Sequence, residues 1–567
     1  MVTKVSDFLL GRLREWGVDR VFGYPGDGIS GLLAAWDRAG NQPAFVQVRH
    51  EEMAAFAAVG YAKFTGRVGV CTATSGPGAI HLLNGLYDAK LDHAPVVAIV
   101  GQTSRSAMGG SYHAEIDLLS LYKDVASEFT EMVTVPEQLP NVLDRAIRTA
   151  LSRHAPAAIV VPSDVQELDY SAPGHASAMV PSSLGVTQPE TTPGRDDLRR
   201  AADVLNRGSR VAMLIGQGAR QAKDEVIAVA DLLGAGVAKA LLGKDVLSDD
   251  LPFVTGAIGL LGTWPSQALM AGCDTLLTIG ASFPYTQFLP KFGQARAVQI
   301  DRDARIIGMR YPNEVNLVGD ARATLTRLIP RLKRKRDQSW RQQVERSVTR
   351  WWKVMESQEQ LAADPINPQL VFGELSRRMP DNAILAADSG SAASWYARHL
   401  KFPAGVRGSL SGSLGTRGPG VPYAIGAKFG HPDRPAIALV GDGAMQMNGL
   451  NELITIGKYW TEWDDPRLIV AVLNNRGLSQ VSWETRAAES APKFAFAQHL
   501  PDVPYAGYAL SLGLGGERVE KPDDIGGAWD RALAADRPCV LEFVTDPAVP
   551  PDPPREPPQE LLAESAG

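Results

Sequence analysis

The 567-residue sequence is poor in cysteine, in long apolar segments and in net positive charge. Its three cysteines (Cys71, Cys273 and Cys539) lie far apart, so it has neither a CxxC motif nor a disulfide framework. No apolar run approaches the roughly 18 residues of a membrane span, and the start shows no signal peptide. A net charge of −6 argues against a general nucleic-acid-binding protein. We therefore expect a cytoplasmic protein with no nucleic-acid partner and no integral membrane segment.

Apolar strands alternate with helical patterns along most of the chain, which is typical of α/β domains with mainly parallel sheets covered by helices. The first and third blocks share a pattern of strand, glycine loop and helix. A basic stretch between the second and third blocks, at 331–353, is typical of a solvated interdomain helix. We expect domains at 1–166, 196–331 and 366–549, linkers at 167–195 and 332–365, and a Pro-rich tail at 550–567.

A glycine-flanked aspartate at 441–443 follows an apolar strand and precedes a helical pattern. Residues 444–473 separate it from Asn474 and Asn475, which close the next apolar strand. Ligands bind at the carboxyl ends of parallel strands, so the Asp442 carboxylate and the Asn475 amide are expected at one edge. Mg²⁺ prefers such oxygen ligands, and a helix N-terminus favours phosphate. The unit predicts a Mg²⁺–diphosphate site, the alternative being a surface turn and a strand end.

Three long motifs, in a fixed order, give the chain a specific resemblance. They are "RHEEMAAFAAVGYAKFTGRVGVCTATSGPG" at 49–78, "SLGTRGPGVPYAIGAKFG" at 413–430 and the GDG…NN unit. Over roughly residues 1–550 the chain resembles the thiamine diphosphate (ThDP) enzymes of the pyruvate oxidase, pyruvate:quinone dehydrogenase and acetolactate synthase group. The resemblance implies pyrimidine-binding, central nucleotide-binding-like and diphosphate-binding domains. It also implies a homodimer or homotetramer with the active site at the subunit interface.

The resemblance assigns cofactor roles residue by residue. Glu51 matches the glutamate that exchanges a proton with the aminopyrimidine ring, a task that needs a carboxyl group. Asp442 and Asn475 match the side-chain Mg²⁺ ligands, and Gly477 matches the position of a backbone carbonyl ligand. The other residues expected around ThDP are Gly26, Ser75, Asp388, Gly390, Ser391, Gly415, Thr416, Arg417, Gly441, Gly443, Ala444 and Leu478.

The central block resembles the FAD domain of pyruvate oxidase and pyruvate:quinone dehydrogenase. The segments "GAIGLLG", "GASFPYTQFLP" and "QIDRDARIIG" carry this resemblance. As a dinucleotide fingerprint the GQG turn at 216–218 is weak, because a third glycine is missing. The candidate FAD residues are Gly216, Gly218, Gly259, Gly280, Ser282, Asp301 and Asp320. The alternative is a vestigial domain that binds another nucleotide or nothing.

Two positions near the reacting carbons depart from the family's pattern. Arg417 stands where acetolactate synthases carry a bulky apolar residue, so it either binds an anionic substrate group or extends outward with its methylenes under the cofactor. His113 and Ala114 replace a Phe-Gln pair, and His113 is either a proton shuttle or a packed imidazole. Trp483 and Glu484 are expected to line the substrate entrance.

The gap between GDG and NN is a few residues longer than is usual in the family. The excess falls in "KYWTEWDDPR", between a helix and a strand. A surface loop lengthens at little cost. We therefore predict a protruding loop that carries Trp460 and Trp463, against a neighbouring subunit.

These features predict ThDP- and Mg²⁺-dependent decarboxylation of a pyruvate-like 2-oxo acid, with oxidation of the enamine intermediate through bound FAD. The alternative activity is acetolactate synthase-like carboligation of two 2-oxo acids. An alternative of another class is a non-catalytic, cofactor-binding regulatory subunit. The presence of Glu51, Asp442 and Asn475 argues against that last alternative.

Overall fold

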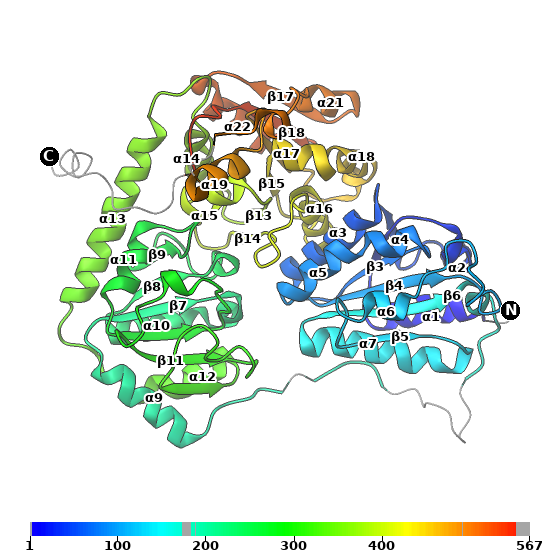
Figure 1. Cartoon of the computed structure of the whole chain (residues 1–567), viewed down its shortest axis with the longest axis horizontal. Coiled ribbons are helices and arrows are strands. Elements are labelled where there is room, and N and C mark those ends of the chain that lie inside the picture. The colour runs from blue at the N-terminus through cyan, green and yellow to red at the C-terminus, as the bar shows by residue number, and fades with distance from the viewer. Residues whose placement is uncertain (1–2, 173–182, 188, 490–491, 552–567) are drawn as a thin grey trace.

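The computed structural model describes residues 3–172, 183–187, 189–489 and 492–551. Three α/β domains follow one another along the chain, and each contains a six-stranded parallel sheet flanked by helices (Figure 1). The predicted fold class is confirmed. The tail expected at 550–567 lies, from residue 552 onward, outside the described residues. No helix within the described ranges has the length and apolar character needed to cross a membrane.

The N-terminal domain has the strand order β2-β1-β3-β4-β6-β5. Its strands are β1 (Arg20–Gly23), β2 (Ala44–Gln47), β3 (Gly69–Ala73), β4 (Val96–Gln102), β5 (Thr130–Met132) and β6 (Pro156–Pro162). Its helices are α1 (Val5–Glu15), α2 (Ser30–Arg38), α3 (Glu51–Thr65), α4 (Pro77–His81), α5 (Leu83–Leu91), α6 (Leu118–Tyr122), α7 (Leu139–Arg153) and α8 (Ser163–Gln166). The central strands β3, β4 and β6 are buried along their whole length, as expected for parallel strands with helices on both faces.

The central domain has the strand order β12-β11-β10-β7-β8-β9. Its strands are β7 (Val211–Ile215), β8 (Gly236–Lys239), β9 (Val254–Ala257), β10 (Thr275–Ile279), β11 (Arg296–Asp301) and β12 (Val315–Val318). Its helices are α9 (Arg195–Arg207), α10 (Lys223–Leu233), α11 (Trp264–Gly272) and α12 (Ala321–Leu328).

The C-terminal domain repeats the N-terminal strand order, as β14-β13-β15-β16-β18-β17, so the pattern shared by the first and third blocks corresponds to one topology. Its strands are β13 (Ile384–Ala387), β14 (Arg407–Ser409), β15 (Ala436–Gly441), β16 (Leu468–Asn474), β17 (Gly515–Val519) and β18 (Cys539–Val544). Its helices are α14 (Pro368–Arg378), α15 (Ser391–Arg398), α16 (Gly420–Gly430), α17 (Asp442–Ala444), α18 (Leu450–Tyr459), α19 (Ser479–Glu489), α20 (Ala495–Gln498), α21 (Tyr505–Ser511) and α22 (Ile525–Leu533).

Helix α13 (Ser339–Glu359) occupies most of the segment expected as a linker at 332–365. One face of this helix packs on the central domain, since the Trp340 indole donates to the Val211 carbonyl at 3.0 Å and the Arg341 guanidinium donates to the Ala235 carbonyl at 2.8 Å. The prediction of a solvated helix is therefore wrong for that face. Figure 1 shows α13 running beside the central domain toward α14, so it braces the two domains.

The prediction of a protruding tryptophan loop is wrong. Trp463 is only 6% exposed, and its ring lies 5.8 Å from that of Phe429 in α16. Trp460 packs, partly buried, against the same core. Burial of each aromatic side chain stabilises the fold, so the extra residues fold back over the end of α16.

The N-terminal and C-terminal domains meet where α3 crosses α16. A Cβ added at Gly60 would lie 2.6 Å from the Tyr423 Cα, and one added at Gly426 would lie 2.2 Å from the Ala57 carbonyl oxygen. Both contacts are with backbone, which cannot move aside as a flexible side chain can. The two glycines therefore permit a closer approach of the helices than any other residue would.

Replacing Gly60 with Ala should destabilise the protein by about 1–3 kcal/mol, because the methyl group forces α3 and α16 apart. The matched control is Gly11→Ala in α1, where an added Cβ meets nothing within 4 Å. That change should stabilise by about 0.5–1 kcal/mol through helix propensity. Urea unfolding of both variants measures the difference, and effects of the same sign would contradict the close crossing.

Candidate functional site

The carboxyl ends of β15 and β16 lie side by side because the two strands pair in parallel. Asp442 follows β15 directly and is 3% exposed. Its Oδ1 accepts from the Gly443 amide at 2.7 Å, and its Oδ2 accepts from the Gly477 amide at 3.1 Å. One buried carboxylate thus draws together both ends of the GDG…NN unit, and the Gly443 amide is already engaged by it.

The two adjacent asparagines have different roles. Asn474 is fully buried, and its Nδ2 donates to Asp502 at 3.0 Å and to Glu542 at 2.8 Å, which fixes the side chain within the domain. The side-chain oxygens of both asparagines are buried without a hydrogen-bond partner among the described residues. Unlike Asn474, the Asn475 side chain makes no hydrogen bond to another described residue, so its amide oxygen is free to act as a ligand.

This donor set fits a divalent cation. Burial raises the pKa of Asp442 to about 6, although the backbone amides around it oppose the shift. A cation beside the carboxylate would remove the cost of burying its charge. The Gly477 carbonyl accepts one bond, from Ser479, and keeps a second lone pair. A π-helical turn, Met445–Gly449, separates this loop from α18, as is common next to functional sites.

Asp388, expected around ThDP, has its carboxylate bonded to backbone amides of the protein. It is fully buried, and its carboxylate accepts from the amides of Ser389, Gly418 and Gly420 at 2.8–2.9 Å. Burial raises its pKa to about 6, with the amides opposing the shift. The side chain therefore holds the loop before α16 in place. Gly390 lines the cavity between the three domains, whereas Asp388 does not.

Glu51 is the first residue of α3 and is 8% exposed. The Nδ1 of His81, at the end of α4, lies 2.9 Å from Glu51 Oε2. The expected neighbours Gly26 and Ser75 lie on adjoining loops. A Cβ at Gly26 would lie 2.5 Å from Thr74, the residue before the buried Ser75.

The start of α3 lies close to the loop before α16 of the same chain. Asn84 Nδ2 donates to Glu52 Oε1 at 2.5 Å and to Thr416 Oγ1 at 3.0 Å. This side chain therefore joins the glutamate pair of the N-terminal domain to the cofactor-facing loop expected at 413–430. Glu52 is partly buried.

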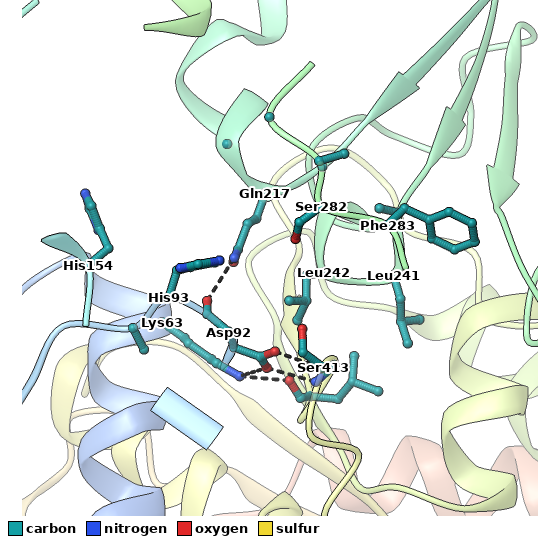
Figure 2. Close-up of a pocket in the computed structure, with 18 of the residues that line it drawn as sticks. Lys63, Asp92, His93, His154, Gln217, Leu241, Leu242, Ser282, Phe283 and Ser413 are labelled. Atoms are coloured by element: carbon teal, nitrogen blue, oxygen red, sulfur yellow. Dashed lines mark hydrogen bonds and ion pairs between the residues drawn. The ribbon is translucent and has the colours of Figure 1, made fainter. Parts of the chain in front are cut away.

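A cavity of about 1180 Å³ lies where the three domains meet, and it exceeds the roughly 300–1,000 Å³ of ordinary small-molecule sites. Figure 2 shows Asp92 at its base. The Asp92 carboxylate accepts from Lys63 Nζ at 2.6 Å and from the Gly412 and Ser413 amides at 2.8 Å each. Its backbone carbonyl accepts from Gln217 Nε2 at 2.8 Å. One residue thus links the N-terminal, C-terminal and central domains.

The structure brings six of the seven candidate FAD residues to this cavity, and the exception is Asp320. The Oδ1 of Asp320 accepts from the Ala323 amide at 3.0 Å, so this residue is the N-cap of α12. Asp301 is 8% exposed and burial raises its pKa. The six cavity-lining candidates are Gly216, Gly218, Gly259, Gly280, Ser282 and Asp301.

The same cavity extends to the residues expected near the substrate. Arg417 lines it and is half-buried, and no hydrogen bond or ion pair joins its guanidinium to another described residue. Glu484 lines it as well and accepts from Gln480 at 2.8 Å. Trp483 keeps a buried indole N–H without a partner among described residues, and Arg486 stacks over its ring at 4.6 Å.

Other expected residues lie apart from the cavity lining. His113 is exposed on the loop between β4 and α6 and is not brought to the cavity. Ser391, the first residue of α15, is half-buried. Leu478 lies against Gly443, where an added Cβ would be 2.6 Å from its methyl group, so it packs beside the metal loop rather than in the cavity.

Sequence reasoning missed His81, Asn84 and Asp92. A signal was present, because "AIHLLNGLYDAKLDH" directly follows the Gly-rich end of the first motif. The polar residues His81 and Asn84 are three positions apart, which places them on one side of a helical segment.

Comparison with known proteins gives three family matches in chain order. The descriptions are thiamine pyrophosphate enzyme, N-terminal TPP binding domain, for residues 3–121; central domain, for 198–328; and C-terminal TPP binding domain, for 388–543. Thiamine pyrophosphate is another name for ThDP.

Individual relatives match most of the chain. A putative thiamine pyrophosphate-containing protein of Bacillus subtilis is 36% identical over 94% of this chain and 90% of its own length. A probable acetolactate synthase large subunit of Methanococcus aeolicus is 31% identical over 96% and 92%. The pyruvate oxidase of Lactiplantibacillus plantarum is 30% identical over 81% and 76%. With its three matched domains and these relatives, the chain belongs to the family of thiamine diphosphate-dependent enzymes.

Proposed function

We propose that the protein decarboxylates a pyruvate-like 2-oxo acid with ThDP and Mg²⁺, and passes the electrons to FAD in the three-domain cavity. The observation that carries this proposal is the continuity of that cavity. It extends from Gly280 and Asp301, at strand ends of the central domain, to Gly415 and Arg417 in the C-terminal domain. A flavin at one end and an oxo acid at the other would share one continuous space.

The chain's own residues supply binding and proton handling in this proposal. Bound ThDP would provide the electron sink for loss of CO₂. Asp442, Asn475 and the Gly477 carbonyl would hold Mg²⁺, which would balance the negative charge of the diphosphate. Glu51 would exchange a proton with the pyrimidine ring. Arg417 would place a permanent positive charge against the carboxylate of the oxo acid.

Acetolactate synthase-like carboligation is the second candidate. The match to the archaeal acetolactate synthase subunit over 96% of this chain favours it. The two candidate activities differ in the second substrate. The oxidative activity needs an electron acceptor, and carboligation needs a second oxo acid. Both use the same metal and pyrimidine residues.

We also propose that two or four copies assemble, with the active site at their interface, and that they work in the cytoplasm. Support for assembly comes from apolar side chains close in sequence to the metal loop and to Asn475: Met447 is 57% exposed, Phe494 62% and Phe496 96%. A second copy would cover such a surface. All three cysteines are free and buried, which suits a reducing compartment.

The purified protein should show flavin absorbance bands, and it should release CO₂ from at least one 2-oxo acid of a panel only with an electron acceptor. Ser282→Trp puts an indole into the cavity and should abolish the flavin bands. Ser209→Trp, on the exposed surface of the same domain, should keep them. Acceptor-independent C–C bond formation would favour the carboligase, and no CO₂ from any oxo acid would contradict both enzyme proposals.

Asp442→Asn removes the charged ligand with little change in size. We expect Mg²⁺-dependent ThDP binding, measured by titration calorimetry, to weaken at least about tenfold. Because the pKa of Asp442 is about 6, wild-type binding should weaken as the pH falls through 6, where protons compete with the metal. Asp433→Asn, at an exposed carboxylate of the same domain, should bind as the wild type does. Equal losses in the two variants would refute the assigned ligand.

Arg417→Met restores the apolar residue that is usual in acetolactate synthases. If Arg417 binds the substrate carboxylate, the KM for the best oxo acid should rise about 10–100-fold, as expected for loss of a charged hydrogen bond, with kcat changed less. Arg537→Met, at an exposed arginine, serves as the matched control. An unchanged KM would instead support an outward-extended Arg417.

A further inference from the structure

The Glu51 carboxylate has a single hydrogen-bonding side-chain partner within the described part of the chain. That partner is the Nδ1 of His81, 2.9 Å from Oε2. The other oxygen, Oε1, lies against Gly78, where an added Cβ would be only 3.1 Å away. His81 therefore fixes the direction of the carboxylate at one oxygen, and the missing side chain of Gly78 leaves the other uncovered.

The His81 ring is itself held by a second imidazole. The ring centroids of His50 and His81 lie 4.2 Å apart, with 31° between the ring planes. His50 is the N-cap of α3, and its Nδ1 accepts from the Glu52 amide at 3.2 Å. The start of the helix thus fixes His50, and His50 restrains one face of His81.

The neighbouring glutamate has a different partner. Asn84 binds Glu52 and reaches on to Thr416 in the C-terminal domain, whereas His81 binds only Glu51 in this group. The segment that ends α4 and begins α5 therefore gives the two glutamates different hydrogen-bond partners. Glu52 contributes to the contact between domains, and Glu51 has a hydrogen-bond donor of its own.

The two carboxylate oxygens of Glu51 differ in their surroundings. An N–H donated from His81 to Oε2 holds that oxygen of the carboxylate in place. Oε1 carries no such bond, so it is the oxygen available to give or take a proton. A carboxylate without the His81 bond would rotate between orientations and present either oxygen.

We propose that His81, restrained by its stack on His50, is a positioning residue that orients Glu51 so that Oε1 exchanges a proton with the aminopyrimidine ring of ThDP. This inference rests on the proposed role of Glu51 in the cofactor site, and it does not depend on the substrate or on FAD.

The test is the rate at which the thiazolium carbon of protein-bound ThDP exchanges its hydrogen with D₂O, followed by NMR without substrate. His81→Phe keeps a ring on His50 but removes the donor, and exchange should slow about tenfold. His81→Asn keeps an N–H donor near Nδ1 without the ring, and exchange should stay within about threefold of wild type. ThDP affinity should remain within about threefold of wild type in both variants.

Three further variants complete the experiment. Glu51→Gln sets the lowest rate. His50→Ser keeps an N-cap oxygen for α3 while removing the stack, so it should slow exchange by itself and serves if His81→Phe fails to fold. His431→Phe removes another imidazole, at the C-cap of α16, whose Nε2 lies 3.0 Å from the Phe64 carbonyl oxygen, and this variant should exchange as wild type does.

Wild-type exchange in His81→Phe, or in His50→Ser if His81→Phe does not fold, would overturn the inference. Equal slowing in His81→Phe and His81→Asn would overturn it too, because the donor would then not matter. A wild-type protein that binds no ThDP would refute the cofactor site and this inference with it. Absence of flavin or of turnover would leave the exchange result standing.

Discussion

The parallel pairing of β15 with β16 is the constraint on which the site depends. It brings Asp442 and Asn475, far apart in sequence, to one sheet edge. Burial raises the pKa of Asp442 to about 6, so this edge is poorly suited to an isolated negative charge and well suited to a bound cation. The unsatisfied oxygen of Asn475 would add a second ligand of the same hard type. A bound metal would offset the free-energy cost of burying these groups.

The second organising feature is the junction at Asp92. Through its carboxylate and its carbonyl, this residue bonds the C-terminal loop at 412–413 and Gln217 of the central domain. The cavity above it exists because three domains converge there (Figure 2). Binding sites between domains are a common solution, since each domain contributes a wall that no single sheet provides. The close crossing of α3 and α16 also holds the N-terminal and C-terminal domains together.

The sequence was sufficient for the three-domain architecture, since motifs, strand patterns and glycine turns agree locally. It was also sufficient to predict that Asp442 follows a strand and precedes a helix. It could not show side-chain direction. An Asp after a strand serves equally as ligand or N-cap: Asp320 caps α12, and Asp388 binds amides of the loop before α16. Nor could it show that Trp463 folds inward, because burial of a loop depends on α16, which is distant in sequence. The polar residues after the first motif mark where His81 lies, but its contact with Glu51 joins two helices and could not be predicted from local sequence.

A crystal structure of the protein grown with ThDP and Mg²⁺ tests the central claim most directly, which is that Asp442 and Asn475 hold the metal for a cofactor activated by Glu51. The account predicts Mg²⁺ at about 2.1 Å from an Asp442 carboxylate oxygen and from Asn475 Oδ1. It further predicts a pyrimidine ring within hydrogen-bond reach of a Glu51 carboxylate, from the same chain or a second copy. ThDP bound beside Asp301 instead, or a metal held by other carboxylates, would contradict it.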